Sequence, residues 1–355
     1  MSNAQRIGVI GGLGNEAMVD LLEKIALDDL ASQQEFVAFG NARLAYKPEE
    51  VGKNWLPDSQ TELRKRDTAT YTLRLLQHLG ADKLGLACNS AHPLFRPLAE
   101  QLPIPFVDMI KQTAAKLSGT PDKVMVLGVN SLVNSGLYQN TLEADGVSAM
   151  RASEAKQELV MDAIYNPVYG IKTAQITPQA EQQLCDVITA EYQAQRCTKV
   201  VLGCTELPLA LTPSSCERFK AQGMIPAEVD VVDASAVLAN ALVHTQGERQ
   251  ALAQPLQSYF GEHTDWFAPL AFAVDSLTEA AEIQKAIFTH TLAYLKDNGK
   301  ALTGSYWHLP TLFFSASASD ITEKLAEAEI AVYTKDTELA ELLPSVMAEY
   351  YVSLA

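Results

Sequence analysis

Two of the five cysteines stand in matching surroundings and carry the chemistry that the sequence suggests most strongly. Cys88 and Cys204 each end a short apolar stretch, and small polar residues follow each of them. A free thiol has a pKa near ~8.5 that falls beside cations and helix N-termini, so it serves as a general acid or base. Two thiols facing one stereocentre favour racemisation or epimerisation, because one removes a proton and the other returns one to the opposite face. The other three, Cys185, Cys197 and Cys216, are interpreted as ordinary buried cysteines.

The residues after each cysteine predict the start of a helix that binds an anion. Backbone N–H groups at such a start bind carboxylates and stabilise a neighbouring thiolate. The small polar side chains expected there, as substrate contacts, helix caps or both, are Asn89, Ser90 and Thr205. His92 is a candidate to lower the thiol pKa and Glu206 to orient a neighbour. A plain helix-start histidine and a solvated charge are the alternatives for these two.

An internal repeat places the two cysteines at corresponding positions. Val124 lies 117 residues after Ile7, in a similar strand-and-turn segment, and Cys204 lies 116 residues after Cys88. Because the two pairs share almost one offset, we expect two similar α/β halves. Each half then presents a first strand with a glycine turn and a later strand that ends in cysteine. The carboxyl ends of parallel strands are where α/β sheets bind their ligands.

The order of strands and helices predicts parallel sheets covered by helices. In the first half we expect strands at 6–10, 36–39 and 83–87, a helix after the turn at 11–14, and a helix at 67–79. The expected fold is α/β, with two pseudosymmetric parallel-sheet domains and the active site in the cleft between them. The first domain covers 1–106, completed by about 209–250, and the second covers 107–208.

The chain after about residue 250 has no counterpart in the repeat. Ser276 and Glu279 form a capping box that opens a long helix ending near Asn298. The further expected elements are strands at 309–315 and 330–333 and helices at 321–328 and 338–350. We therefore expect residues 256–355 to form a smaller accessory α/β domain, whose role the sequence does not indicate.

Composition excludes several classes of function. The chain has 355 residues, with 43 Asp and Glu against 27 Lys and Arg, and a formal net charge of −16. Sequence-independent nucleic-acid binding and attachment to an anionic membrane both need a cationic surface, so the acidic composition argues against both.

With no signal-peptide pattern and no apolar run of ~18 residues, reduced thiols in the cytoplasm are the expectation. Neither a metal-ligand cluster nor a Schiff-base lysine with a phosphate cup is evident, so we expect no cofactor.

Four segments, by their order and spacing, resemble the signature segments of the aspartate/glutamate racemase superfamily. They are Gly11-Gly12-Leu13-Gly14, Cys88-Asn89-Ser90-Ala91-His92, Ser135-Gly136-Leu137-Tyr138-Gln139 and Gly203-Cys204-Thr205-Glu206-Leu207-Pro208. The resemblance implies a homodimeric, cofactor-independent racemase of aspartate, glutamate or a related amino acid, with Cys88 and Cys204 as its two bases. The substrate contacts that it implies are Gly12, Leu13, Asn89, Ser90 and Thr205.

Several positions depart from the family pattern. Met18 and Leu132 stand where the family has hydroxyl residues. In aspartate-specific members an arginine follows the second strand, and Lys47 aligns with it, with Arg43 nearby. Lys172 matches a second cation that pairs with the side-chain carboxylate of the substrate. A lysine is a point charge rather than a bidentate fork, so the choice of amino acid stays open. A plain surface charge is the alternative interpretation for Arg43, Lys47 and Lys172, and for Arg43 we favour it.

Three other functions compete with racemisation. Maleate isomerases and arylmalonate decarboxylases use a similar scaffold with cysteine as nucleophile or sole acid. A non-catalytic amino-acid sensor would keep the cleft and tolerate Met18 and Leu132. The segment 12–17 also fits the dinucleotide fingerprint G-x-G-x-x-A, and Arg43 would suit the 2′-phosphate of NADP. An NADP-dependent oxidoreductase leaves the two cysteines at one repeat offset unexplained.

Overall fold

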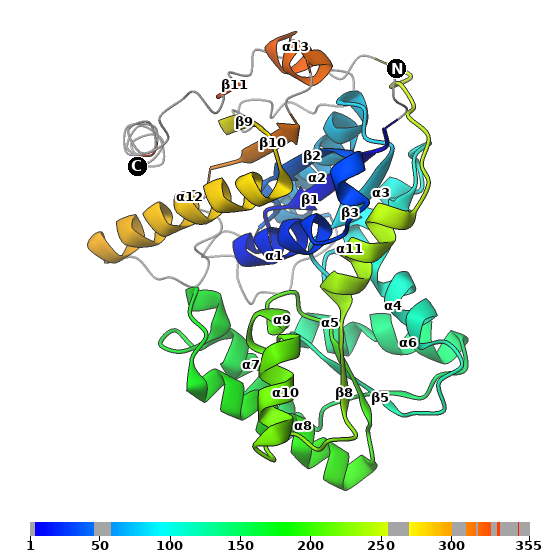
Figure 1. Ribbon diagram of the computed structural model, residues 1–355, viewed down its shortest axis with the longest axis vertical. Helices are drawn as coiled ribbons and strands as arrows, with labels where there is room; N and C mark the ends of the chain where they lie inside the picture. Colours follow the sequence, from blue (N-terminus) through cyan, green and yellow to red (C-terminus); the bar gives the residue numbers. More distant parts are fainter. Residues whose placement is uncertain are drawn as a thin grey trace. The chain divides into compact units, whose positions relative to one another are not determined.

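The chain divides into two compact α/β units in a computed structural model (Figure 1). The structure describes residues 4–45, 58–254, 270–299, 310–316, 319–327, 332–333 and 347. Within these residues, unit 1 takes its parts from Met1–Ala87, His92–Val107 and Ala239–Ala355. Unit 2 consists of Cys88–Ala91 and Asp108–Leu238, so the first cysteine segment belongs to the same unit as Cys204.

Unit 2 is built on a four-stranded parallel sheet with the order β6-β5-β7-β8. Its strands are β5 Val124–Leu127, β6 Ala149–Arg151, β7 Lys199–Leu202 and β8 Asp230–Asp233. Its helices are α4 Met109–Leu117, α5 Asn130–Ser135, α6 Leu137–Ala144, α7 Glu154–Tyr165, α8 Pro178–Gln195, α9 Leu207–Ala210 and α10 Pro213–Ala221, with a 3-10 turn at Ile171–Thr173. The strands β5 and β7 are buried almost throughout, as expected for a parallel sheet covered by helices.

Unit 1 contains a seven-stranded sheet in the order β11-β9-β10-β2-β1-β3-β4. Its first four strands are β1 Arg6–Gly11, β2 Glu35–Gly40, β3 Lys83–Leu86 and β4 Phe106–Val107. These four are parallel and ordered β2-β1-β3-β4, which matches β6-β5-β7-β8 strand for strand. The expected pair of similar parallel-sheet halves is therefore confirmed.

The helices of unit 1 are α1 Asn15–Ala26, α2 Gln60–His78, α3 His92–Ala99, α12 Leu277–Asp297 and α13 Ser319–Glu327, together with 3-10 turns at Ala31–Gln33 and Ala42–Leu44. The helix α11, Ala234–His244, begins in unit 2 and continues into unit 1. The helix expected over 67–79 begins earlier, because Ser59 caps it by accepting a hydrogen bond from the Glu62 N–H at 3.4 Å.

The boundary between the two halves differs from the expected one. Because β8 pairs with β7 in the sheet of unit 2, residues from 209 up to Leu238 belong to unit 2 rather than completing the first domain. The chain returns to unit 1 at Ala239, within α11. The segment that completes unit 1 therefore begins at Ala239, rather than at about residue 209 as expected.

The C-terminal residues form an α/β region whose strands extend the sheet of unit 1. The strands are β9 Leu270–Val274, β10 Leu312–Ala316 and β11 Val332–Tyr333. β10 pairs antiparallel with β2, with Leu312 opposite Gly40, and β9 lies parallel to β10. The sequence did not indicate this pairing, which covers the β2 edge that the repeat leaves open. The helix expected over 338–350 lies, apart from Met347, outside the described residues.

A buried arginine also joins the two ends of unit 1. Arg6, at the start of β1, is 1% exposed and pairs with Glu35 at 2.6 Å and with Asp320 of α13 at 3.2 Å. Its Nη1 donates to the carbonyl of Leu79 at 2.6 Å. Because a buried guanidinium needs several acceptors, Asp320 couples the C-terminal region to the first strand of the chain.

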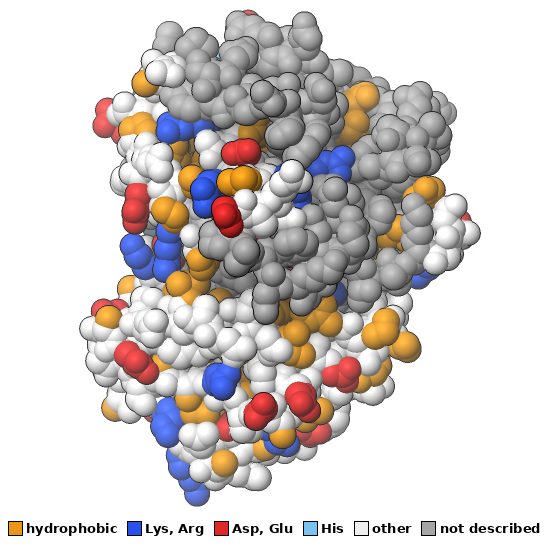
Figure 2. Space-filling model, turned by 180° about the vertical axis from the view of Figure 1, so that it is seen from behind, with side chains coloured by type: hydrophobic (Ala, Val, Ile, Leu, Met, Phe, Trp, Pro, Cys, Tyr) orange, Lys and Arg blue, Asp and Glu red, His pale blue; other side chains and the backbone are white. Residues whose placement is uncertain are grey.

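Basic and acidic side chains are interspersed on one face of the described residues (Figure 2). Figure 2 shows Lys, Arg, Asp and Glu side chains alternating over the described residues of one face. No helix in the described parts of the chain is both long enough and apolar enough to cross a membrane.

Lys83 gives unit 1 a pH-dependent stability. This residue begins β3, is fully buried, and donates to Gln34 Oε1 and to the carbonyl of Thr245, both at 2.8 Å. Burial lowers the pKa of Lys83 to about 8, against the opposing charge of Asp82. The unfolded chain holds this proton up to about pH 10.5, so between these two values the unfolded state binds more protons. Stability contributed by this group therefore rises with pH across that window.

We expect Lys83→Met to remove this rise. Relative to the variant, the wild-type free energy of unfolding should increase by about 1–2 kcal/mol from pH ~8 to ~9.5, as measured by urea unfolding. Lys199, at the equivalent position of β7, is the matched control, because its ammonium is partly exposed and pairs with Asp230 at 2.9 Å. Lys199→Met should keep the wild-type slope. An unchanged slope in Lys83→Met would contradict the prediction.

Candidate active site

The two cysteines occupy equivalent places at the carboxyl ends of equivalent strands. Cys88 follows β3 and Cys204 follows β7, each two residues beyond the last residue of its strand. Cys204 is 7% exposed, and Cys88 is partly exposed. Since both residues fall in unit 2, the charges around them can be compared directly. The repeat in the sequence predicted this equivalence.

A buried ion pair stands beside Cys204. The Cys204 thiol donates to Glu206 Oε2 at 3.0 Å, and the Lys172 ammonium forms a short ion pair with the other carboxylate oxygen of Glu206. The Lys172 side chain is 10% exposed and that of Glu206 is 4% exposed. Lys172 Nζ also lies 5.6 Å from the centre of the Tyr165 ring. The Glu206 carboxylate thus bridges the Lys172 ammonium and the Cys204 thiol.

Burial and the ion pair together set the protonation of Cys204. Burial raises the pKa of the Cys204 thiol well above its usual value, the charge of Glu206 raises it further, and Lys172 opposes both. Although burial would raise the pKa of Glu206, the Lys172 ammonium and the Cys204 hydrogen bond hold it below its ordinary value. Cys204 is therefore a thiol that donates to an ionised carboxylate.

Cys88 lies in the field of the same ion pair but has more groups that favour its thiolate. Removal from water raises the pKa of the Cys88 thiol, and Glu206 raises it further. The Ser90 hydroxyl, 3.5 Å from the sulfur, the Ala91 N–H and the Lys172 charge each lower it. The two thiols thus share one electrostatic environment, with different local partners.

The polar residues that follow the cysteines differ in burial. Asn89 is 2% exposed, and its side-chain oxygen accepts a hydrogen bond of 2.6 Å from the fully buried Tyr138 hydroxyl. Thr205 is 4% exposed, whereas Ser90 is exposed. Sequence reasoning gave Tyr138 no role of its own, although it lies in one of the four family-like segments. Its contact with Asn89 joins residues 49 positions apart, so spacing along the chain does not reveal it.

In unit 1 the glycine turn, defined here as residues 11–15, follows β1. Gly12 has φ +101°, and a Cβ there would lie 2.2 Å from the backbone oxygen of Asn41, so only glycine fits. Leu13 is half-buried beside it. Arg43 is also half-buried, and its carbonyl accepts a hydrogen bond of 2.6 Å from Arg64. Lys47, the expected partner of a substrate carboxylate, lies outside the described residues.

The two departures from the family pattern are both packing residues. Met18 is fully buried, and its Sδ would lie 2.2 Å from a Cβ placed on Gly11. Leu132 is 1% exposed, and its Cδ2 would lie 2.8 Å from a Cβ on either Gly128 or Gly203. Each apolar side chain fills the space above a glycine at the end of a strand. At both positions a buried apolar side chain that packs on a glycine stands in place of the hydroxyl residue of the family.

His92 is the first residue of α3 in unit 1 and is fully buried. Its ring packs against that of Phe106, with 5.6 Å between the ring centres. The pKa of the Cys88 thiol is shifted by burial and by Ser90, Glu206, Ala91 and Lys172. The packing supports the plainer interpretation of this histidine as part of the core of unit 1.

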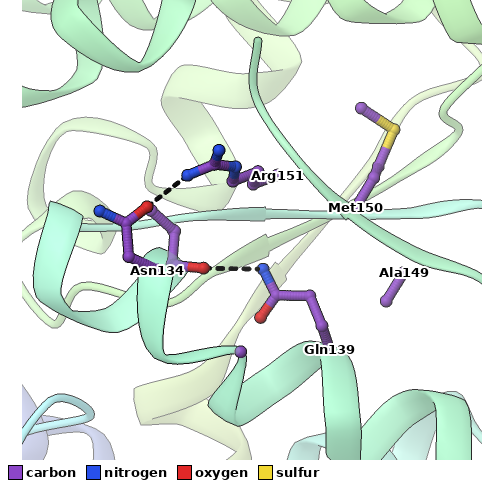
Figure 3. A pocket seen from close by; sticks show the side chains of 7 residues that line it. Asn134, Gln139, Ala149, Met150 and Arg151 are labelled. Carbon is purple, nitrogen blue, oxygen red and sulfur yellow. Dashed lines mark hydrogen bonds between the residues drawn. The ribbon is translucent and has the colours of Figure 1, made fainter. Parts of the chain in front are cut away.

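A separate cavity of about 550 Å³ opens on unit 2 between α5, α6 and β6. Figure 3 shows Arg151 pointing toward Asn134, whose side-chain oxygen accepts its hydrogen bond. Gln139 Nε2 donates to the carbonyl of Val133 at 3.4 Å. The residues that line the cavity are Val133, Asn134, Gly136, Gln139, Ala149, Met150 and Arg151. None of the expected site residues is among them.

The chain is similar in sequence to known amino-acid racemases. The chain is 25% identical over 170 residues to the broad specificity amino-acid racemase RacX of Bacillus subtilis, covering 48% of this chain and 67% of that protein. It is 29% identical over 192 residues to a glutamate racemase of Pseudomonas entomophila, covering 53% of this chain and 66% of that protein. The matched part thus spans about two thirds of each relative.

Solved structures show the same fold. An aspartate racemase of Picrophilus torridus matches 68% of this chain and 93% of its own, with a TM-score of 0.53 and 23% identity. An aspartate racemase homologue of Pyrococcus horikoshii matches 67% of this chain and 97% of its own, with a TM-score of 0.51 and 20% identity. The model of the family described as Asp/Glu/Hydantoin racemase matches residues 7–242. The strand repeat, the paired cysteines and this match agree, and the chain belongs to the Asp/Glu/Hydantoin racemase family.

Proposed function

We propose that this protein is a cofactor-independent racemase of aspartate, glutamate or a related amino acid, with Cys88 and Cys204 as its two bases. The observation that carries the proposal is that both thiols lie in the field of one buried ion pair, Lys172 and Glu206. Their equivalent positions after β3 and β7 support it, because inversion needs two comparable groups on opposite faces of one carbon.

The two thiols begin the reaction in different states. Cys204 is a thiol held by its hydrogen bond to Glu206, so it starts as the proton donor. Cys88 has the Ser90 hydroxyl and the Ala91 N–H to stabilise a thiolate, so it starts as the base. Since burial raises the pKa of both thiols, the positive α-ammonium of a bound amino acid, which would lower both values, favours formation of the thiolate.

The proton transfers balance across one turnover. The Cys88 thiolate takes the Cα proton and becomes a thiol, and the electron pair of the broken C–H bond is delocalised toward the α-carboxylate. Cys204 gives its proton to the opposite face of Cα and becomes a thiolate beside the Lys172 ammonium. The product has the inverted configuration, and the cysteines have exchanged protonation states. The reverse reaction then starts from Cys204 as the base.

The polar residues near the cysteines are proposed to hold the substrate. Asn89, Ser90 and Thr205 would bind the α-amino and carboxylate groups, and Lys172 is the cation available for a side-chain carboxylate. In unit 1, Gly12 and Leu13 offer backbone N–H groups of the glycine turn, where α1 begins without a side-chain cap. Lys47 is proposed as a second cation for an acidic side chain.

Exchange of the Cα proton with deuterated water tests this function directly. The reduced, folded protein is incubated with a panel of L- and D-amino acids, and both exchange and inversion are followed by mass spectrometry and chiral chromatography. We expect both enantiomers of at least one acidic amino acid to exchange and invert without added cofactor. If no amino acid on the panel exchanges, the racemase proposal is wrong and an amino-acid sensor becomes the better interpretation.

A further inference from the structure

The C-terminal region reaches the glycine turn, although it lies outside the residues that match the racemase family. The family match ends at residue 242, whereas α12 and β10 come later in the chain. Figure 1 shows α12 lying along α1, the helix that follows the turn, and these two helices pack closely. The turn therefore has neighbours that the family pattern does not contain.

The direct contact is made by Gln284. This residue lies on α12 and is 2% exposed, and its Nε2 donates to Asn15 Oδ1 at 3.0 Å. The same amide group lies 3.5 Å from the Asn15 carbonyl. Asn15 is the first residue of α1 and the last of the glycine turn, and it is also 2% exposed. The hydrogen bond is thus buried and ends on the turn itself.

Gln284 interrupts an otherwise mostly apolar stripe. The buried residues of α12 recur with helical spacing at Leu277, Ala280, Ala281, Ile283, Gln284, Ile287, Phe288, Thr291 and Leu295. Among the described residues, the side-chain oxygen of Gln284 has no hydrogen-bond partner, so the residue is a costly choice for packing alone. A single amide in an apolar helix contact sets the register of two helices at the expense of stability. Here the hydrogen bond of that amide ends on Asn15, the first residue of α1.

A second contact from the same region supports the other side of the turn. β10 pairs with β2 so that Leu312 lies opposite Gly40. The next residue, Asn41, is fully buried and packs so closely on Gly12 that no side chain fits between them. The Asn41 N–H also donates to the carbonyl of Gly11 at 3.2 Å. α12 therefore contacts the turn directly, and β10 pairs with the end of β2, next to the residue that packs on Gly12.

We propose that Gln284 is a positioning residue for the racemase site, through which the C-terminal region holds the glycine turn in place for substrate binding. This proposal rests on the proposed function, in which Gly12 and Leu13 bind the amino acid. The turn carries glycines at three of its five positions, and glycine keeps more backbone freedom than other residues. A hydrogen bond that holds the last residue of the turn reduces the number of conformations that the free turn adopts. Less conformational entropy is then lost when the substrate binds.

Gln284→Met in the full chain tests the proposal. Methionine has similar length and no branch, so it keeps the packing of α12 while it removes the donor. We expect KM for the best racemisation substrate to rise about tenfold with kcat nearly unchanged. The Met18 amide, which donates to the Gly14 carbonyl at 3.3 Å, should exchange with deuterated water several-fold faster, about the effect of a lost hydrogen bond. In an Asn15→Ala background, Gln284→Met should add no further rise in KM.

Ile287→Val is the matched control. Ile287 is fully buried on the same face of α12, and the change weakens packing without touching a polar contact to the turn. It should lower the melting temperature and leave KM unchanged. An unchanged KM in Gln284→Met, or an equal rise in Ile287→Val, would overturn the positioning role. If the wild type racemises no amino acid, the proposed function fails, and the Met18 exchange rate alone decides whether Gln284 tethers the turn.

Discussion

Replacing either Cys88 or Cys204 by serine should lower kcat/KM for racemisation by about 10²–10⁴-fold. A serine hydroxyl has nearly the shape of the thiol but does not ionise near neutral pH, so each variant loses one acid–base group and keeps the packing. Chiral chromatography of the best substrate measures the loss. Binding of the amino acid, measured by calorimetry, should change little, because the side chains proposed to hold the substrate remain.

The two variants should also differ from each other in a diagnostic way. Each retains one thiol, which can exchange the Cα proton of the enantiomer that faces it without inverting the carbon. We therefore expect opposite enantiomer preferences for deuterium incorporation in Cys88→Ser and Cys204→Ser. Cys216→Ser is the control, because Cys216 is 8% exposed in the core of unit 2 and burial raises its pKa to about 11. Racemisation at the wild-type rate in either active-site variant would rule out a two-base mechanism.

The two similar parallel-sheet halves could be predicted from sequence because the repeat is local and doubled. Each strand-and-turn segment carries its own pattern, and the offset between Cys88 and Cys204 aligns the halves without any knowledge of contacts. The capping box at Ser276 was predictable for the same reason. The Ser276 Oγ accepts a hydrogen bond of 3.1 Å from the Glu279 N–H, only three residues away. Signals contained within one segment were therefore predictable.

The extension of the sheet was not predictable by the same means. The antiparallel pairing of β10 with β2 joins Leu312 to Gly40, and neither segment alone indicates its partner. The apolar residues of β10 fit equally well into the separate domain expected for 256–355. Pairing across such a separation depends on which strand edge remains uncovered, and that is a property of the assembled sheet.

The environment of the cysteines could be predicted only in part. Glu206 was expected to orient a neighbour, and its neighbour along the chain, Cys204, donates to it. Its ion-pair partner Lys172 lies 34 residues away, and the sequence suggested a substrate contact for that lysine instead. The ion pair with Glu206 is observed, and the substrate contact of Lys172 stays a prediction.

Removing the ammonium from this ion pair should destabilise unit 2. In Lys172→Met the Glu206 carboxylate stays buried beside Cys204 without its cation, which costs roughly 3–5 kcal/mol. Burial would then raise the pKa of Glu206, so the variant would regain stability at low pH as that carboxyl becomes protonated. The loss in free energy of unfolding should therefore be larger near pH ~8 than near pH ~5, as measured by urea unfolding.

The double variant Lys172→Met/Glu206→Gln separates stability from chemistry. It leaves no buried charge, so most of the stability lost in Lys172→Met should return. Racemisation of dicarboxylic amino acids should stay impaired, because the cation proposed for their side chains is still absent. Glu206→Gln alone should lower the pKa of Cys204, since it removes a negative charge and keeps Lys172, and the ultraviolet absorbance of the thiolate reports this shift. A single variant Lys172→Met with wild-type stability at both pH values would show that the ion pair does not hold Glu206 ionised.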